Sequence, residues 1–232
     1  MRATHQHGGG IGFACAILGT LGTALTSAAP AQAQELTGSQ ILSKALDLRK
    51  GINDFSARFA IHLDIERLDI PDSSGTVYFK RPDKLRVVGE RGLVILPKDA
   101  IMPTRIAKAI EDGADVTLMG KRDTPAAVIY GLKIVPKQDD ENVRLLAWIN
   151  GRNWTMQKME VWRGTRRAMS IDWEHTLVQK RFWLPKSVTC TLGQRAGPGR
   201  RRMKGTASVT FTDYRVNSGL DDALFSTPEE RR

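Results

Sequence analysis

The feature that most constrains the fold is a long series of short β-strand patterns separated by turn residues, which begins soon after Gly51. Residues 59–66 alternate strictly, so that Phe59, Ile61 and Leu63 share one face and polar side chains share the other. Further strand-like segments follow at 76–80, 84–88, 92–96, 116–121, 127–135, 143–150, 155–163, 168–174, 183–192 and 206–215. Strands this short and regularly spaced predict an antiparallel meander.

Two helical patterns accompany the strands. Residues 37–53 place Ile41, Leu42 and Ala45 at helical spacing, either Thr37 or Ser39 can cap this helix, and Gly51 is expected to end it. Residues 103–112 predict a second, short helix. No linker or low-complexity tract divides residues 34–232, which are long enough for one buried core. We therefore expect a single, mainly β domain with two or three helices, folded as a barrel or sandwich.

The N-terminus has the organisation of a secretory signal peptide. Arg2 precedes an uncharged, largely apolar stretch from residue 11 to 29, and Ala31 and Ala33 form the A-x-A pattern of a cleavage site. A membrane anchor is the alternative, but the apolar core is short and no basic run follows it. Cys15 raises lipidation as a third interpretation, although Gly12-Phe13-Ala14 is a poor lipobox. We predict that residues 1–33 are a signal peptide cleaved near Ala33, and therefore that the protein is exported.

Charge and cysteine content narrow the classes of partner and fold. Removal of residues 1–33 leaves 34 basic and 25 acidic side chains, a net charge of +9. This excess favours anionic partners such as lipid head groups, and export argues against nucleic acid. Residues 34–232 keep one cysteine, Cys190, so no internal disulfide can form and stability must come from the core.

Several later strands are apolar on both faces. Residues 144–149 (RLLAWI) and the surroundings of Met169, Ile171 and Trp173 lack the alternation expected of a sheet with one wet face. Either both faces are covered, one of them by helices, a curled sheet or a ligand, or the pattern reflects ordinary core and edge packing.

Catalytic and metal-binding patterns are sparse. His62 and His175 lie on separate predicted strands and have no metal-ligand spacing, so we predict no metal and no cofactor. Cys190 lies in an alternating strand, where a buried thiol is the usual state, and a dyad with either histidine has no pattern in its favour. No nucleophile elbow, dinucleotide fingerprint or P-loop is present. We predict no catalytic residues.

A cationic segment lies between the last two strand patterns. Residues 199–205 contain Arg200, Arg201, Arg202 and Lys204, which could contact anionic head groups or phosphates. The alternative is a solvated loop whose charges discourage edge-to-edge pairing of strands.

The segment 74–86 (SGTVYFKRPDKLR) follows an amphipathic helix and one strand. In this segment and in the order of its elements, the sequence resembles the bacterial outer-membrane lipoprotein-sorting (LolA-like) superfamily. The segments 130–136, 145–150, 156–161, 184–185 and 221–228 also resemble the family pattern in the same order. Residues 90–121 depart from it, because they lack the usual D-G-x-x-x-w-x-Y phrase.

The resemblance implies an incomplete antiparallel β-barrel whose concave side is covered by helices and holds acyl chains, with residues 34–232 as one such domain. It implies a non-enzymatic periplasmic carrier for a lipid or lipoprotein, with transient contact to an anionic membrane surface or membrane-bound partner proteins. The lining residues expected on this basis are Phe59, Ile61, Leu63, Val77, Phe79, Trp148, Trp162 and Trp173. Two alternatives stay open: a periplasmic sensor or regulatory module with the same fold, and an exported hydrolase that uses Cys190 or a histidine.

Overall fold

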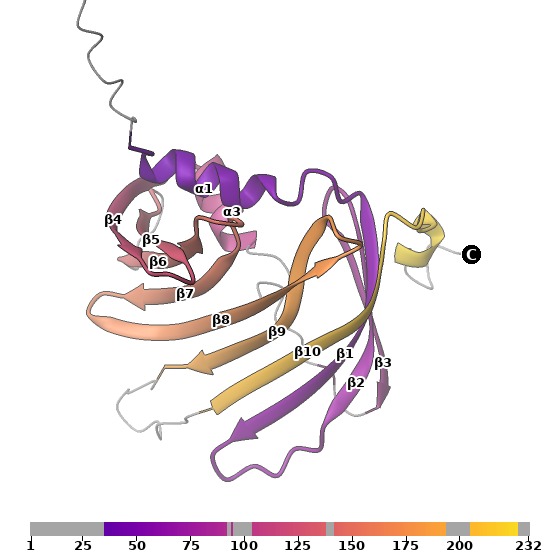
Figure 1. The fold of residues 1–232 in the computed structure, drawn as a ribbon. Helices are drawn as coiled ribbons and strands as arrows, with labels where there is room; N and C mark the ends of the chain where they lie inside the picture. Colours follow the sequence, from indigo (N-terminus) through magenta and orange to yellow (C-terminus); the bar gives the residue numbers. More distant parts are fainter. Residues whose placement is uncertain (1–34, 92–93, 95–103, 138–141, 194–204, 227–232) are drawn as a thin grey trace, which may run out of the picture. The chain divides into compact units, whose positions relative to one another are not determined.

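One antiparallel sheet contains every strand in the part of the chain that the structure, a computed structural model, describes: residues 35–91, 94, 104–137, 142–193 and 205–226 (Figure 1). The strands are β1 (Asp54–Ile65), β2 (Ser73–Lys80), β3 (Lys84–Arg91), β4 (Asp115–Asp123), β5 (Val128–Val135), β6 (Val143–Asn150), β7 (Met156–Arg163), β8 (Arg166–Val178), β9 (Phe182–Leu192) and β10 (Gly205–Val216). The described residues from Leu36 onward form one compact unit.

The strand order is β3-β2-β1-β10-β9-β8-β7-β6-β5-β4. Consecutive strands pair except for β3 and β4, and among the described strands β1 with β10 is the one pairing between strands distant in sequence. The chain leaves one edge of the sheet after β3 and returns at the opposite edge as β4. Because β3 and β4 do not pair, the sheet does not close. The predicted mainly β fold with an incomplete barrel is therefore confirmed.

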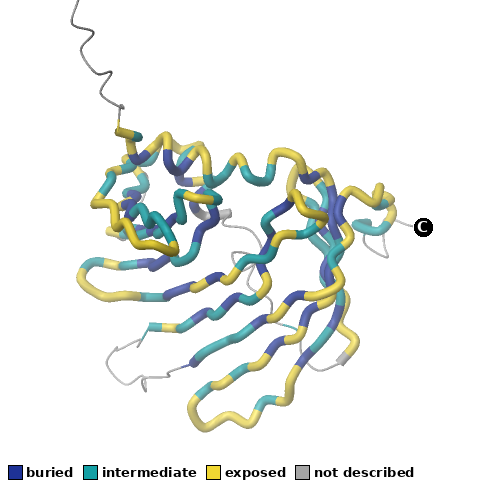
Figure 2. Tube along the Cα trace, in the orientation of Figure 1, coloured by how far each residue is buried: buried dark blue, intermediate teal, exposed yellow. Residues whose placement is uncertain are grey.

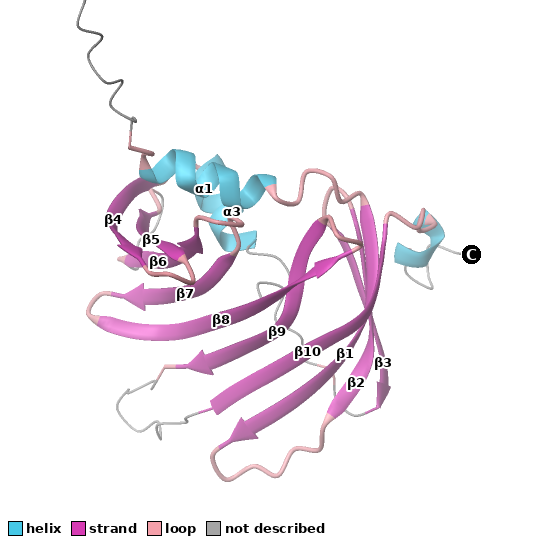
Figure 3. Ribbon diagram, viewed as in Figure 1, coloured by secondary structure: helices cyan, strands magenta, loops and turns pink. Residues whose placement is uncertain are grey.

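Two helices, α1 (Gly38–Asp47) and α3 (Thr104–Glu111), pack on the same face of the sheet (Figures 1 and 3). A capping box starts α1: the Gln40 amide donates to Thr37 Oγ1 at 3.2 Å, and the Thr37 amide donates to Gln40 Oε1 at 2.9 Å. Gly38 brings α1 close to β4, because a Cβ at this position would lie 3.0 Å from the Leu118 amide nitrogen. We call the face that the helices cover the inner face.

The core lies between the inner face and the helices. Ile41 and Leu42 of α1 and Ile106 and Ala109 of α3 belong to the same cluster of buried side chains as the apolar residues of the strands. Buried and exposed positions alternate along β1 and β10 (Figure 2), as expected for a sheet with one face packed and one face solvated.

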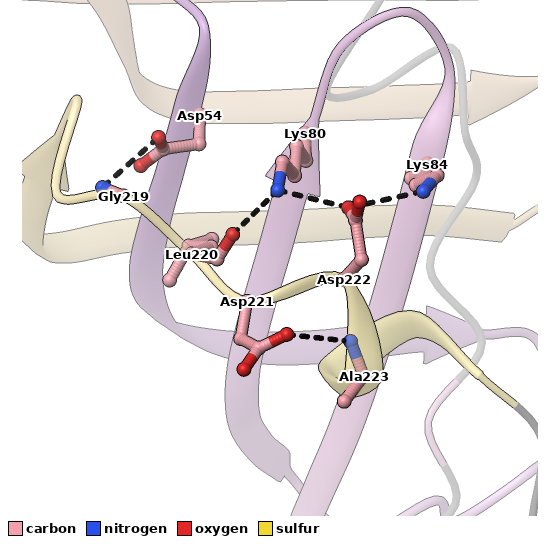
Figure 4. Close-up of polar contacts among 8 residues, drawn as sticks. All are labelled: Asp54, Lys80, Lys84, Gly219, Leu220, Asp221, Asp222 and Ala223. Carbon is pink, nitrogen blue, oxygen red and sulfur yellow. Dashed lines mark hydrogen bonds and ion pairs between the residues drawn. The ribbon is translucent and has the colours of Figure 1, made fainter. Parts of the chain in front are cut away.

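The last described segment crosses the outer face of β1, β2 and β3 (Figure 4). The buried carboxylate of Asp54 accepts hydrogen bonds from the backbone amides of Ser218 at 2.8 Å and Gly219 at 3.1 Å. Asp222, in the short 3-10 helix η1 (Asp222–Phe225), forms ion pairs with Lys80 at 2.8 Å and Lys84 at 3.0 Å. These contacts hold the end of the domain against the sheet.

Element boundaries differ most from the sequence prediction at the end of α1 and at the start of β1, which begins at Asp54 and not at Phe59. The predicted helix continues to residue 53, but α1 ends at Asp47 and the next residues form turns. The Arg81 guanidinium donates to the carbonyls of Arg49 and Ile52 in this turn, which fixes it as a connection to β1. The predicted strand 143–150 coincides with β6 at both ends.

Three predictions concern residues outside the described ranges: the signal peptide over 1–33, most of the strand at 92–96, and the cationic residues Arg200, Arg201, Arg202 and Lys204. Among the described residues, no helix is both long enough and apolar enough to cross a membrane.

Candidate functional site

The inner face is a continuous apolar surface built by cross-strand pairing. One row of directly paired residues crosses eight strands, and every member is apolar: Leu63, Ala207, Cys190, Ile171, Met159, Ala147, Leu132 and Leu118. A second apolar row lies two residues along and contains Ile65, Gly205, Leu192, Met169, Val161, Leu145, Ile134 and Val116. The register of the sheet thus gathers side chains from all parts of the sequence onto one surface.

The inner face is buried in its middle and accessible at one end. Ile171, Met159, Ala147 and Leu132 are fully buried. At the ends of β1 and β9 the second row becomes accessible: Ile65 is partly exposed, and Leu192 is 51% exposed. Leu68, which bridges to Ile65, is 52% exposed. We call Ile65, Leu68, Met169 and Leu192 the apolar rim.

Six of the eight predicted lining residues lie on the inner face. Phe59, Ile61 and Leu63 of β1, Val77 and Phe79 of β2, and Trp173 of β8 share it. Phe59 packs over Gly75, where a Cβ would lie 2.8 Å from the end of the Phe59 ring.

The other two predicted lining residues lie on the outer face. Trp148 lies opposite Gly131 and Lys158 in the sheet, and Trp162 lies opposite Arg144. These positions belong to the outer face, the face that the helices do not cover. The structure therefore separates Trp148 and Trp162 from the other six. Sequence reasoning did not divide the two groups because residues 144–149 are apolar at nearly every position.

An aromatic cluster occupies the inner face toward the end of β10. Phe55 lies 5.3 Å from Phe79 and 5.9 Å from Tyr214 between ring centroids, and Phe211 lies 6.3 Å from Tyr214. Such tilted arrangements are favourable for aromatic pairs. Sequence analysis missed Phe55, Phe211 and Tyr214, although Phe55 lies on the same face of β1 as Phe59.

The sheet divides next to this cluster. Pairing between β9 and β10 stops at Ser187 and Thr210, although β9 continues beside β8 and β10 continues beside β1. The Tyr214 hydroxyl spans the gap and donates to the Pro185 carbonyl at 2.7 Å. The turn after α1 lies beside the start of β9, since a Cβ at Gly51 would be 3.4 Å from the Phe182 ring.

Three ionisable groups with altered pKa values lie at this division. Burial lowers the pKa of Arg49 to about 10 and raises the pKa of Tyr214. Burial, and secondly the Arg49 cation, lower the pKa of His175 to about 4. His175 is therefore neutral at pH 7. Among the described residues, no carboxylate pairs with the Arg49 guanidinium.

The residues considered for catalysis are not brought together. Cys190 lies on the inner face opposite Ile171, whereas His175 lies farther along β8 opposite Pro185. His62 lies on the outer face and contacts Asp72 at 2.8 Å. Within the described ranges, no group of three or more histidine, cysteine or acidic side chains could hold a metal ion.

Comparison with solved structures identifies the architecture. A DUF1329 family protein from Desulfovibrio piger superposes with a TM-score of 0.61 at 12% identity, over 83% of this chain and 98% of that chain. A LolA superfamily protein from Nitrosomonas europaea gives 0.57 at 16% identity, over 84% and 100%. An outer membrane lipoprotein-sorting protein domain from Vibrio parahaemolyticus gives 0.61 at 11% identity, over 84% and 98%.

The chain has a LolA-like fold. The predicted resemblance is thereby confirmed at the level of structure. Comparisons with family models and with curated protein sequences find no match. The apolar rim and the two apolar rows lie on the inner face. This is the face on which the sequence resemblance to the LolA-like superfamily implies an acyl-binding surface.

Proposed function

We propose that this protein is a periplasmic carrier that binds the acyl chains of a lipid or lipoprotein on its inner face. The observation that carries the proposal is the pair of apolar rows that cross eight strands and end at the exposed apolar rim. The LolA-like fold supports a lipid-binding function.

The rim gives an acyl chain a way to reach apolar surface. Leu192 and Leu68 expose about half of their surface, next to the partly buried Leu63 and Met169. Burial of an acyl chain is favourable by about 0.8 kcal/mol for each CH₂ group. Contact with several CH₂ groups at the rim would therefore support reversible binding, which a carrier requires.

We propose further that the protein acts without catalysis. Cys190 and His62 lie on opposite faces of the sheet, and Cys190 and His175 lie opposite different residues of the β8–β9 ladder. A nucleophile needs its general base within hydrogen-bond reach. The separation of Cys190 from both histidines argues against a cysteine–histidine nucleophile pair.

Two matched substitutions test the acyl-binding proposal. Leu192→Asp places a charge on the rim, whereas Leu177→Asp places the same charge away from the rim, at the other end of β8, where Leu177 is 44% exposed. We expect Leu192→Asp to weaken binding of a fluorescent fatty-acid probe by about tenfold or more, because a carboxylate is costly to desolvate. Leu177→Asp should bind the probe as the unsubstituted protein does.

Equal probe binding by both variants would contradict the rim as the entry point. No probe binding by the unsubstituted protein would contradict the acyl-binding function itself. Circular dichroism and thermal unfolding of both variants establish that each has folded.

A further inference from the structure

The outer face of β5–β8 differs from the rest of the outer face in its side chains. It carries two tryptophans and four cations on adjacent strands, which we call the outer patch: Lys133, Arg144, Trp148, Lys158, Trp162 and Arg167. Across β9, β10 and β1, the same rows continue mostly as threonine, serine and other polar residues. The outer patch is therefore a local feature of one half of the sheet.

Each tryptophan of the outer patch lies beside a cation on the neighbouring strand. The Arg144 guanidinium carbon lies 5.0 Å from the centre of the Trp162 ring, and Lys158 Nζ lies 5.4 Å from the centre of the Trp148 ring. Both contacts join direct cross-strand partners. The indole of Trp148 also covers Gly131, where a Cβ would lie 3.8 Å from Trp148 Nε1 and 3.5 Å from Met119 Cε.

One carboxylate lies beneath these groups. Glu160 accepts hydrogen bonds from Trp162 Nε1 at 2.9 Å and Arg167 at 3.1 Å, and it pairs with Lys158 at 3.2 Å. Although burial raises it, the pKa of Glu160 is lowered overall by the hydrogen bonds from Trp162, Lys158 and Arg167. Glu160 is thus ionised and holds Lys158 and Arg167 in place.

The charges of the outer patch do not cancel. Its four cations face Glu160 and, at its border, Asp172, which pairs with Lys158 across the strands. Among the described residues of the patch and its border, an excess of two positive charges remains. The patch therefore complements an anionic surface.

We propose that the outer patch is a docking surface for the anionic head groups of a phospholipid bilayer. Indole rings favour the head-group level of a bilayer, and lysine and arginine side chains are attracted to anionic lipids. Strands β5–β8 are paired on both sides, so a partner cannot extend the sheet here and meets side chains alone. The surface lies on the opposite face from the apolar rows, and it does not depend on the proposed acyl binding.

The test compares vesicles of phosphatidylcholine with vesicles that also contain phosphatidylglycerol. Lys133→Glu/Lys158→Glu reverses two charges of the outer patch, and the matched control Lys180→Glu/Lys186→Glu reverses two exposed lysines elsewhere. We expect the patch variant to bind phosphatidylglycerol vesicles about tenfold or more weakly in co-sedimentation, and the control variant to change much less. Added salt should weaken binding of the unsubstituted protein.

A second readout uses the tryptophans and leaves the charges unchanged. Vesicles with brominated acyl chains should quench tryptophan fluorescence of the unsubstituted protein, and Trp148→Phe/Trp162→Phe should remove this quenching. Trp183→Phe, on β9, should keep it. Equal losses in the two charge variants, equal binding to phosphatidylcholine alone, or binding only to an acidic protein would overturn the proposal.

Discussion

The two faces of the sheet show what its register does with neighbouring residues. The inner row from Leu63 to Leu118 is apolar in all eight strands. The outer row one residue along contains Asp64, Thr206, Thr191, Ser170, Glu160, Leu146, Lys133 and Thr117. Adjacent residues thus serve opposite environments, and a shift of one residue would exchange the faces.

The contrast between the faces weakens at β6. Leu146 and Trp148 place apolar side chains on the outer face, beside Glu160 and Lys158. Aromatic rings also cover a glycine on each face, Phe59 over Gly75 inside and Trp148 over Gly131 outside. The inner ring joins the core, whereas the outer ring lies beside a lysine. An aromatic ring therefore packs over a glycine on both faces. The two faces differ in whether charged side chains surround that ring.

The largest effect should come from emptying the middle of the inner row. Ile171→Ala should lower the free energy of unfolding by about 2–5 kcal/mol, because Ile171 is fully buried and leaves a cavity. Thr191→Ala, in the adjacent outer row, should change it by about 0.5 kcal/mol or less. Urea denaturation measures both. Equal losses would mean that the faces are not distinguished by burial as described.

The next largest effect on stability depends on pH. It concerns His175, which lies near the place where the pairing of β9 with β10 stops. Because the folded protein holds the pKa of His175 at about 4, below its usual 6.5, the neutral form is favoured in the folded state. Stability from this group is fully present above pH 6.5 and is lost as the pH falls through 4. The full loss is about 3 kcal/mol.

His175→Gln should remove that component of the pH dependence, so the stability of the unsubstituted protein should fall relative to that of the variant as the pH falls from 6.5 to 4. Denaturant titrations at several pH values in this range measure the difference. Parallel curves would show that His175 does not titrate in a buried setting. His62, which is exposed and whose pKa is raised by its hydrogen bond to Asp72, has the opposite dependence and provides a control.

Features of the fold that depend on neighbouring residues could be predicted from the sequence. Features that depend on contacts between residues distant in the sequence could not. Alternation in β1 identified Phe59, Ile61 and Leu63 as one face, because period-two patterning needs only local information. The β1–β10 pairing, which builds both apolar rows, joins residues distant in sequence and leaves no local signal. Trp148 and Trp162 were grouped with the lining residues because hydrophobicity alone does not distinguish a core ring from one beside a lysine or arginine.

A smaller effect on the free energy of unfolding should come from the contacts that hold the last described segment on the outer face. Asp54→Ala leaves the amides of Ser218 and Gly219 without their acceptor and should cost about 1–3 kcal/mol (Figure 4). Asp222→Asn, which weakens exposed ion pairs with Lys80 and Lys84, should have a lesser effect that disappears in high salt. A larger loss from Asp222→Asn would show that the ion pairs hold this segment.

The central claim is that the inner face binds acyl chains, and mass spectrometry of lipid extracted from the natively purified protein tests it most directly. The account predicts an acyl lipid in roughly equimolar amount, which Leu192→Asp reduces and Leu177→Asp does not. A protein that carries no lipid and takes up no acyl probe would contradict it.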